Sequence, residues 1–149
     1  MLDAQDLFEN TITPTLKKAG LYTLAAAKLV LYTAGHESLM GKYDRQIKGP
    51  ALSIYMIEPA TYWDVAPRRK TYLTELGYTE IPPPIEMIED LQLATLICRL
   101  KYLDFKEALP NYDDLPGMAA YWKKYYNTPL GKGTEQEFIK NNKSYTSIV

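Results

Sequence analysis

The chain has 149 residues, of which 46% are hydrophobic and 23% are charged, and its formal net charge is −1. This composition is ordinary for one domain spanning residues 1–149, long enough to bury roughly 70% of the surface that its unfolded form exposes. The near-zero charge gives no basic field for nucleic acid, and no stretch approaches the ~18 consecutive apolar residues of a membrane helix. With one cysteine and one histidine in the chain, we expect no internal disulfide, no metal site and no cofactor.

Two helical regions are predicted before residue 40. Asp3 is a suitable N-cap for a first helix, which Pro14 breaks or restarts and Gly20 ends. Residues 21–37 then carry Leu, Val, Ala and Tyr at a density that is typical of a helix buried on most sides. We expect this second helix to be the central one.

The middle of the chain is predicted to alternate between loops and short helices. Residues 41–49 are charged and contain glycine, which indicates an exposed loop or a short hairpin. The apolar stretch 51–57 is expected to be a buried piece, strand-like or irregular. Pro59 suits the start of a helix that Pro67 interrupts, and a further short helix is expected over 68–76.

A proline-rich stretch separates the middle of the chain from the last helices. Residues 81–84 (Ile-Pro-Pro-Pro) are expected to be extended, because a residue that precedes proline is pushed out of the helical region. The longest helix is predicted over 85–105. Asp113 or Asp114 is expected to cap a helix that runs to about residue 126.

The C-terminal part is predicted to contain one more short helix. Thr134 and Glu137 have the spacing of a capping box, and the helix that they start is expected to end near residue 141. We expect the tail, about residues 144–149, to be loose. Cys98 lies in the apolar run 91–103 and is expected to be a buried, inert thiol.

The four residues Gly35-His36-Glu37-Ser38 stand where the buried central helix ends. A carboxyl group held against apolar walls has its charged form disfavoured, so its pKa rises and it can hold a proton near neutral pH. Glu37 is therefore a candidate general acid; the alternative is a solvated glutamate at a helix end. His36 does not share the face of Glu37, and we expect it to be structural or solvated.

Three blocks in this order resemble the lysozyme-like lytic transglycosylase superfamily. They are Glu37-Ser38 at a helix end, residues 53–56 (Ser-Ile-Tyr-Met) followed by Pro59-Ala60-Thr61, and a Tyr-Asn motif within 125–131. The residues that flank the second block are similar to those of phage-encoded members. The resemblance implies a mainly α-helical, lysozyme-like domain of the goose-type lysozyme and lytic transglycosylase kind, with at most a small hairpin.

The resemblance also implies an activity. In this superfamily one glutamic acid protonates the glycosidic oxygen between N-acetylmuramic acid and N-acetylglucosamine. In the transglycosylase branch the same residue then acts as a base, so that the muramic acid C6 hydroxyl closes an anhydro ring. Glu37 would thus be the catalytic residue of a peptidoglycan lytic transglycosylase or muramidase. The candidate substrate-binding residues are Ser38, Tyr55, Met56, Tyr126 and Asn127.

Aromatic residues have two interpretations in this pattern. The resemblance implies that the Tyr126 hydroxyl faces Glu37, and packing in the core is the alternative. Tyr55, Tyr62 and Trp63 are candidates to stack on sugar rings, and core packing is again the alternative.

Two further carboxylates and two departures from the family pattern bear on the reaction. Asp44 and Glu58 could position water for simple hydrolysis, or could serve as loop and cap residues.

The family block commonly has glycine and glutamine where this chain has Ser53 and Met56, so an amide that could hold an N-acetyl group is absent. The Tyr-Asn motif continues with Thr-Pro-Leu. These departures indicate altered substrate contacts or a domain that has drifted away from catalysis.

The N-terminal sequence MLDAQDLFEN does not resemble a signal peptide. A phage enzyme would then act on the periplasmic cell wall either from the virion, aiding genome entry, or as a free endolysin. Its expected partners are bacterial peptidoglycan and other virion proteins. The alternative is a non-catalytic tail or head-tail structural protein that keeps the fold. An open groove in which Glu37 faces Tyr126 would favour the enzyme, and a groove filled by Met56 or by the tail would favour the structural protein.

Overall fold

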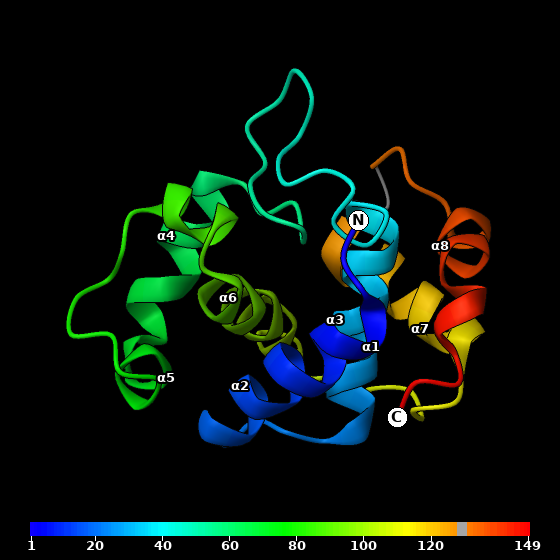
Figure 1. Cartoon of the computed structure of the whole chain (residues 1–149), viewed down its shortest axis with the longest axis horizontal. Helices are drawn as coiled ribbons and strands as arrows, with labels where there is room; N and C mark the ends of the chain where they lie inside the picture. Colours follow the sequence, from blue (N-terminus) through cyan, green and yellow to red (C-terminus); the bar gives the residue numbers. More distant parts are fainter. Residues whose placement is uncertain (128–130) are drawn as a thin grey trace.

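The computed structural model describes residues 1–127 and 131–149, and these parts of the chain are mainly helical, as predicted (Figure 1). The elements in chain order are α1 (Ala4–Leu7), η1 (Phe8–Ile12), α2 (Thr13–Lys18), α3 (Leu24–Glu37), α4 (Pro59–Arg68), α5 (Lys70–Glu75), η2 (Pro84–Ile88), α6 (Leu91–Leu103), α7 (Leu115–Tyr121), η3 (Trp122–Asn127), α8 (Glu135–Asn142) and η4 (Lys143–Tyr145). In these ranges extended backbone pairs only in two isolated antiparallel bridges, Arg45 with Leu52 and Leu52 with Ile57. No helix in the described ranges has the length and apolar character needed to cross a bilayer.

Helix α3 is the central helix, as predicted. It begins at Leu24 rather than near residue 21, because the Thr23 hydroxyl accepts the backbone N–H of Ala26 at 3.0 Å and so caps the helix. Every residue from Ala26 to Gly35 is buried. The helix packs against α6 and α8 and runs through the middle of the molecule in Figure 1.

Several predicted ends of helices are confirmed. Asp3 caps α1, Pro14 lies in the first turn of α2 where a helix restarts, and Gly20 follows α2 with a positive φ of 73°. Asp114, and not Asp113, caps α7. Thr134 forms the predicted capping box at the start of α8.

Two predicted boundaries are wrong. Pro67 does not interrupt α4 but lies in its last turn. The single helix predicted over 85–105 is divided in two: η2 is a 3-10 helix, and α6 starts only at Leu91. The division follows from Asp90, whose side chain accepts the backbone N–H of Leu93 at 3.0 Å and fixes a new helix start.

The prediction of a loose C-terminal tail is also wrong. The Lys28 side chain, on α3, is 1% exposed, and its ammonium group donates to the carbonyl oxygens of Thr146 (2.9 Å), Ile148 (2.6 Å) and Tyr145 (3.4 Å). Ile148 packs into the hydrophobic core. A buried ammonium needs acceptors, and the tail supplies them, so the chain end is held against the central helix.

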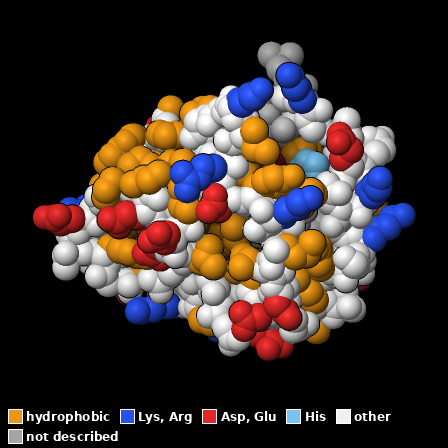
Figure 2. All heavy atoms as spheres, turned by 45° about the horizontal axis from the view of Figure 1, so that its top comes forward, with side chains coloured by type: hydrophobic (Ala, Val, Ile, Leu, Met, Phe, Trp, Pro, Cys, Tyr) orange, Lys and Arg blue, Asp and Glu red, His pale blue; other side chains and the backbone are white. Residues whose placement is uncertain are grey.

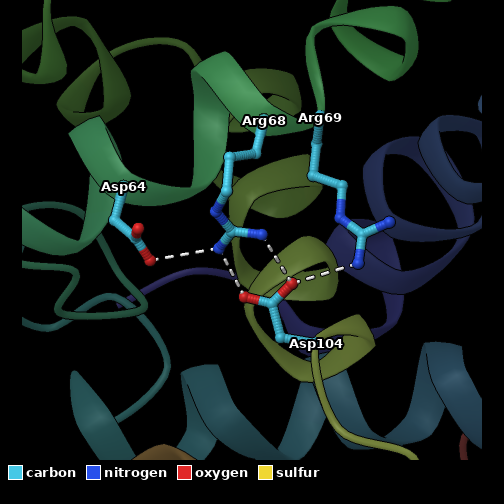
Figure 3. A network of polar contacts seen from close by, with 4 residues as sticks. All are labelled: Asp64, Arg68, Arg69 and Asp104. Atoms are coloured by element: carbon cyan, nitrogen blue, oxygen red, sulfur yellow. Dashed lines mark hydrogen bonds and ion pairs between the residues drawn. The ribbon is translucent and has the colours of Figure 1, made fainter.

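A network of ion pairs joins the end of α4 to the end of α6 (Figure 3). The Asp104 carboxylate accepts from Arg68 at 2.8 Å and from Arg69 at 3.1 Å, and Arg68 also pairs with Asp64 at 3.1 Å. Hydrogen bonds from Arg68 lower the pKa of Asp104, and those from Arg69 add to this. The network fixes the C-terminal end of α6, whose last turns carry one wall of the pocket described below.

Candidate active site

A pocket of about 560 Å³ opens beside the end of α3. Its described lining comes from distant parts of the sequence: Glu37 from α3, Tyr43, Arg45, Gln46, Ile47, Ala51, Met56 and Glu58 from the segment that follows, Thr61 from α4, Lys101 from α6, and Tyr126, Asn127 and Gly131 from η3 and beyond. Figure 2 turns the upper end of Figure 1 toward the reader and shows hydrophobic side chains on this face with basic and acidic ones among them. The described lining is mixed: apolar and aromatic side chains such as Ile47, Met56 and Tyr126 alternate with polar and charged ones such as Glu37, Glu58 and Lys101.

Glu37 is the last residue of α3 and lies in this pocket. Its Oε2 atom accepts a hydrogen bond from the indole Nε1 of Trp122 at 2.9 Å. Burial raises the pKa of Glu37 to about 7, although the Trp122 hydrogen bond and the positive charge of Lys101 both oppose this rise. The desolvation predicted from the apolar helix is therefore the dominant effect on this carboxyl group.

Trp122 is held in place by two other rings. Its ring centroid lies 4.5 Å from that of His36, in an edge-on contact, and 5.1 Å from that of Phe138, in a stacked contact. His36 Nδ1 lies 3.0 Å from the Asn141 side-chain nitrogen. The structure thus confirms a structural role for His36, which packs against the tryptophan that orients Glu37.

Lys101 brings a positive charge into the same pocket. Its Nζ donates to the Tyr126 carbonyl oxygen at 3.0 Å and lies 3.7 Å from the centroid of the Tyr126 ring. Burial lowers the pKa of Lys101, and the charges of Glu37 and Glu58 raise it. No spacing along the chain links this lysine to Glu37, so sequence reasoning did not identify it.

The segment between Glu37 and α4 forms a wall of the pocket in an unusual backbone conformation. Every non-glycine residue with positive φ in the described ranges lies within it: Leu39 (52°), Met40 (58°), Lys48 (58°), Ser53 (74°) and Met56 (49°). Such conformations are uncommon for residues with a Cβ atom and persist where surrounding contacts enforce them, often at functional sites. The buried stretch 51–57 is confirmed as irregular rather than as a strand.

Two of the predicted substrate contacts are wrong because the side chains are buried away from the pocket. Ser38 is 0% exposed; its hydroxyl donates to the Ala34 carbonyl and accepts the Gly41 N–H, which closes the end of α3. Tyr55 is also 0% exposed, and its hydroxyl is bonded to Thr95 Oγ1 at 2.7 Å. Neither side chain is free to touch a sugar.

The other aromatic candidates do not line the pocket either. Tyr62 is fully buried and donates to the Pro82 carbonyl oxygen at 2.6 Å. Trp63 is half-exposed and stands edge-on against Tyr62, outside the described lining. The core interpretation therefore holds for Tyr62, and Trp63 lies outside the described lining of the pocket.

Tyr126, Asn127 and Met56 do line the pocket, but Tyr126 has a different partner from the predicted one. Its hydroxyl donates to the Tyr55 carbonyl oxygen at 2.5 Å and not to Glu37. This bond holds the irregular turn that carries Met56. The Asn127 side-chain oxygen accepts from Lys123 at 2.8 Å, while the rest of the motif, residues 128–130, lies outside the described residues.

Of the two candidates for a second carboxylate, one lines the pocket and the other does not. Glu58 lines the pocket and stands just before α4. Asp44 is exposed, is not part of the described lining, and pairs with Arg45 at 3.1 Å. Asp44 is therefore an unsuitable partner for Glu37, and Glu58 remains the one candidate of the two.

The described residues contain no group of three or more His, Cys, Asp or Glu side chains that could hold a metal ion. Cys98 is buried, as predicted, and burial raises the pKa of its thiol to about 12. What the pocket does offer is a carboxyl group that can give and take a proton near neutral pH, beside an ammonium group.

No family model, curated protein or solved structure matches this chain. The fold and the site therefore describe the protein only as a mainly helical chain with a buried carboxyl group at the end of its central helix, whose pKa is raised to about 7 by burial.

Proposed function

We propose that this protein cleaves the glycan strands of bacterial peptidoglycan between N-acetylmuramic acid and N-acetylglucosamine, with Glu37 as general acid and base. We further propose that its helical chain is a lysozyme-like domain. One observation carries the proposal: Glu37 lies in an open pocket, accepts an indole N–H, and has a pKa of about 7. A carboxyl group in an apolar setting beside an indole is a known way to keep a glycosidase acid protonated at neutral pH.

In the proposed reaction the protonated Glu37 gives its proton to the glycosidic oxygen as the bond to the muramic acid C1 breaks. The resulting Glu37 carboxylate then accepts the proton of the C6 hydroxyl, whose oxygen bonds to C1 and forms the 1,6-anhydro ring. Glu37 ends the cycle protonated, so one carboxyl group is sufficient. Its pKa near neutrality suits both steps.

Hydrolysis is the variant of this reaction that would need a second carboxylate. Glu58 supports it by lining the same pocket, where it could hold a water molecule as a general base. The products would then carry reducing ends in place of anhydro rings.

For the setting we propose a phage virion, in which local opening of the cell wall assists genome entry. A non-catalytic structural role in the virion is the second candidate, and two observations favour it. The Tyr126 hydroxyl is engaged by the Tyr55 carbonyl and not by Glu37, and Met56 stands in the pocket where the family commonly has glutamine. Against it, the pocket remains open, and the tail is bound to Lys28 on α3 rather than filling the pocket.

The test is the loss of turbidity of purified Gram-negative peptidoglycan with wild type and with Glu37→Gln, followed by mass spectrometry of the products. Removal of a positioned general acid should slow the reaction by about 10²–10⁴-fold. Asp44→Asn is a matched control, because it removes a nearby carboxylate that lies outside the pocket lining, and it should keep the wild-type rate.

The products distinguish the variants of the proposal. 1,6-Anhydro sugars support the transglycosylase reaction, and reducing ends with a slow Glu58→Gln variant support hydrolysis. If wild type and Glu37→Gln are both folded and equally inert, the enzyme proposal fails and the structural role takes its place.

A further inference from the structure

The ammonium group of Lys101 is fixed in the Glu37 pocket by a single residue. Tyr126 accepts a hydrogen bond from Nζ through its carbonyl oxygen at 3.0 Å, and its ring lies 3.7 Å beneath the same nitrogen. Tyr126 is itself buried and tied to the Tyr55 carbonyl oxygen through its hydroxyl. The positive charge is therefore held in one position before any ligand arrives, which reduces the entropy cost of binding to it.

Lys101 has fewer protein acceptors than two other lysines that are partly or fully buried, Lys123 and Lys28. Lys123 donates to three oxygens, those of the Asn127 side chain and of the Gly131 and Gly133 carbonyls, at 2.8, 2.8 and 2.7 Å. Lys28 likewise donates to three carbonyl oxygens of the tail. Within the described ranges Lys101 has one acceptor, the Tyr126 carbonyl, and no carboxylate within ion-pair distance.

An ammonium group can donate three hydrogen bonds, so Lys101 keeps donor capacity on the side of the pocket that it lines. Partial burial of an unpaired cation is unfavourable, and a pocket anion would relieve it. The second cation of the described lining, Arg45, is already paired with Asp44 at 3.1 Å. Among the described lining residues, Lys101 is thus the cation without an ion-pair partner, and it lies in the same pocket as the proposed catalytic carboxyl group.

We propose that Lys101 forms a carboxylate subsite in the Glu37 pocket, which binds the acidic substituent of an N-acetylmuramic acid unit. This inference rests on the proposed function and names the group that distinguishes one sugar of the glycan from the other. A singly charged carboxylate matches the one charge of the Lys101 ammonium group. A doubly charged phosphate would be repelled more strongly than a carboxylate by Glu58, which lines the same pocket.

The carboxylate has two sources in peptidoglycan: the lactyl ether of the sugar, or the peptide attached to it. Binding of three small ligands separates them: N-acetylglucosamine, N-acetylmuramic acid, and N-acetylmuramyl-L-alanine, in which the lactyl group is an amide and the alanine carries the charge. The readout is the NMR signal of the Trp122 indole N–H, which donates to Glu37 and is assigned by comparison with Trp122→Phe. No cleavage is involved, so the result does not depend on activity.

We expect wild type to bind at least one of the two acidic ligands about tenfold more tightly than N-acetylglucosamine, as a charge-assisted hydrogen bond provides. Lys101→Met should remove that advantage without weakening N-acetylglucosamine, and Lys101→Arg should keep part of it. Lys124→Met is the matched control, because Lys124 also lies over a tyrosine ring, 5.1 Å from that of Tyr125, but is exposed and pairs with Glu107. It should bind like wild type.

Preference for N-acetylmuramic acid would assign the subsite to the lactyl carboxylate, and preference for the alanyl ligand alone would assign it to the peptide. Equal affinity of wild type for all three ligands would overturn the inference, and this comparison needs no variant. The inference would also be overturned if Lys101→Met, shown to be folded by its thermal unfolding transition, still bound the acidic ligands more tightly than N-acetylglucosamine. A wild type that prefers the acidic ligands but leaves peptidoglycan intact would refute the proposed function and not the subsite.

Discussion

The indole nitrogen of Trp122 lies 2.9 Å from Oε2 of Glu37, although 85 positions separate the two residues in the chain. The bond orients the one carboxyl group whose burial raises its pKa to about 7. Because an N–H donor stabilises the carboxylate more than the acid, this hydrogen bond lowers the pKa and limits the effect of burial. Trp122 thus keeps the pKa of Glu37 close to neutral pH, where the carboxyl group can both give and accept a proton.

Replacement of Trp122 by phenylalanine should raise the pKa of Glu37 further. The variant keeps most of the apolar contact with His36 and Phe138 but loses the donor to the carboxylate. A carbon-13 NMR titration of the Glu37 carboxyl group measures the midpoint directly, and we expect it above the wild-type value. Trp63→Phe is the control, since Trp63 is half-exposed and outside the pocket lining; an unchanged midpoint in Trp122→Phe would contradict the assigned bond.

The Glu37→Gln variant should be more stable than wild type at alkaline pH. The folded pKa of Glu37 is raised from 4.5 to about 7, so its stabilising contribution is fully present below about pH 4.5 and is lost as pH rises through 7. Glutamine keeps the acceptor for Trp122 without a charge. Urea unfolding should show a variant more stable by up to about 3 kcal/mol at pH 8 and little different at pH 4.

Glu58→Gln is the comparison for that experiment, because it removes the same charge from the same pocket on an exposed side chain. If the free energy of unfolding of both variants rises equally at pH 8, the cause is the change in net charge and not the burial of Glu37. Glu37 would then be a solvated residue at a helix end.

Gly35→Ala should destabilise the fold. A Cβ atom at Gly35 would clash with Oδ1 of Asn142, whose Nδ2 donates to the Tyr32 and Phe138 carbonyl oxygens and so joins α8 to α3. Overpacking of this kind costs about 1–3 kcal/mol. Thermal unfolding of Gly35→Ala, Asn142→Ala and the double variant forms a double-mutant cycle. Gly35→Ala should reduce the stability less in the Asn142→Ala background than in wild type. If the losses of stability of the two single variants simply add in the double variant, the clash is not the cause.

Lys28→Met should release the C-terminal tail. The methionine keeps the apolar stem of the side chain but leaves the carbonyl groups of residues 145, 146 and 148 without this donor, at a cost of about 1–3 kcal/mol. Hydrogen exchange of the amides of residues 144–148 should become faster, while that of α6 stays slow. Lys17→Met removes an exposed lysine that also lies near a tyrosine ring, that of Tyr22, and should leave exchange in the tail unchanged.

Much of the local structure was predictable from the sequence because it depends on neighbouring residues. Caps at Asp3, Asp114 and Thr134 act within three or four positions, and the long apolar run that became α3 could only be buried. One helix boundary was wrong because two local signals competed. An apolar periodicity suggested one helix over 85–105, but the side chain of Asp90 accepts a backbone N–H and starts a new helix.

The sequence by itself determined that this protein is mainly helical and that Glu37 stands at the end of its most buried helix. Only the tertiary structure decided what surrounds that carboxyl group. The Trp122 indole, the Lys101 ammonium and Glu58 come from elements far apart in the chain, and no periodicity relates them to Glu37. The same reason explains why Ser38 and Tyr55 are buried instead of facing the pocket, and why Lys28 holds the tail. Long-range partners are selected by packing, whereas caps and helices are set by residues within a turn of each other.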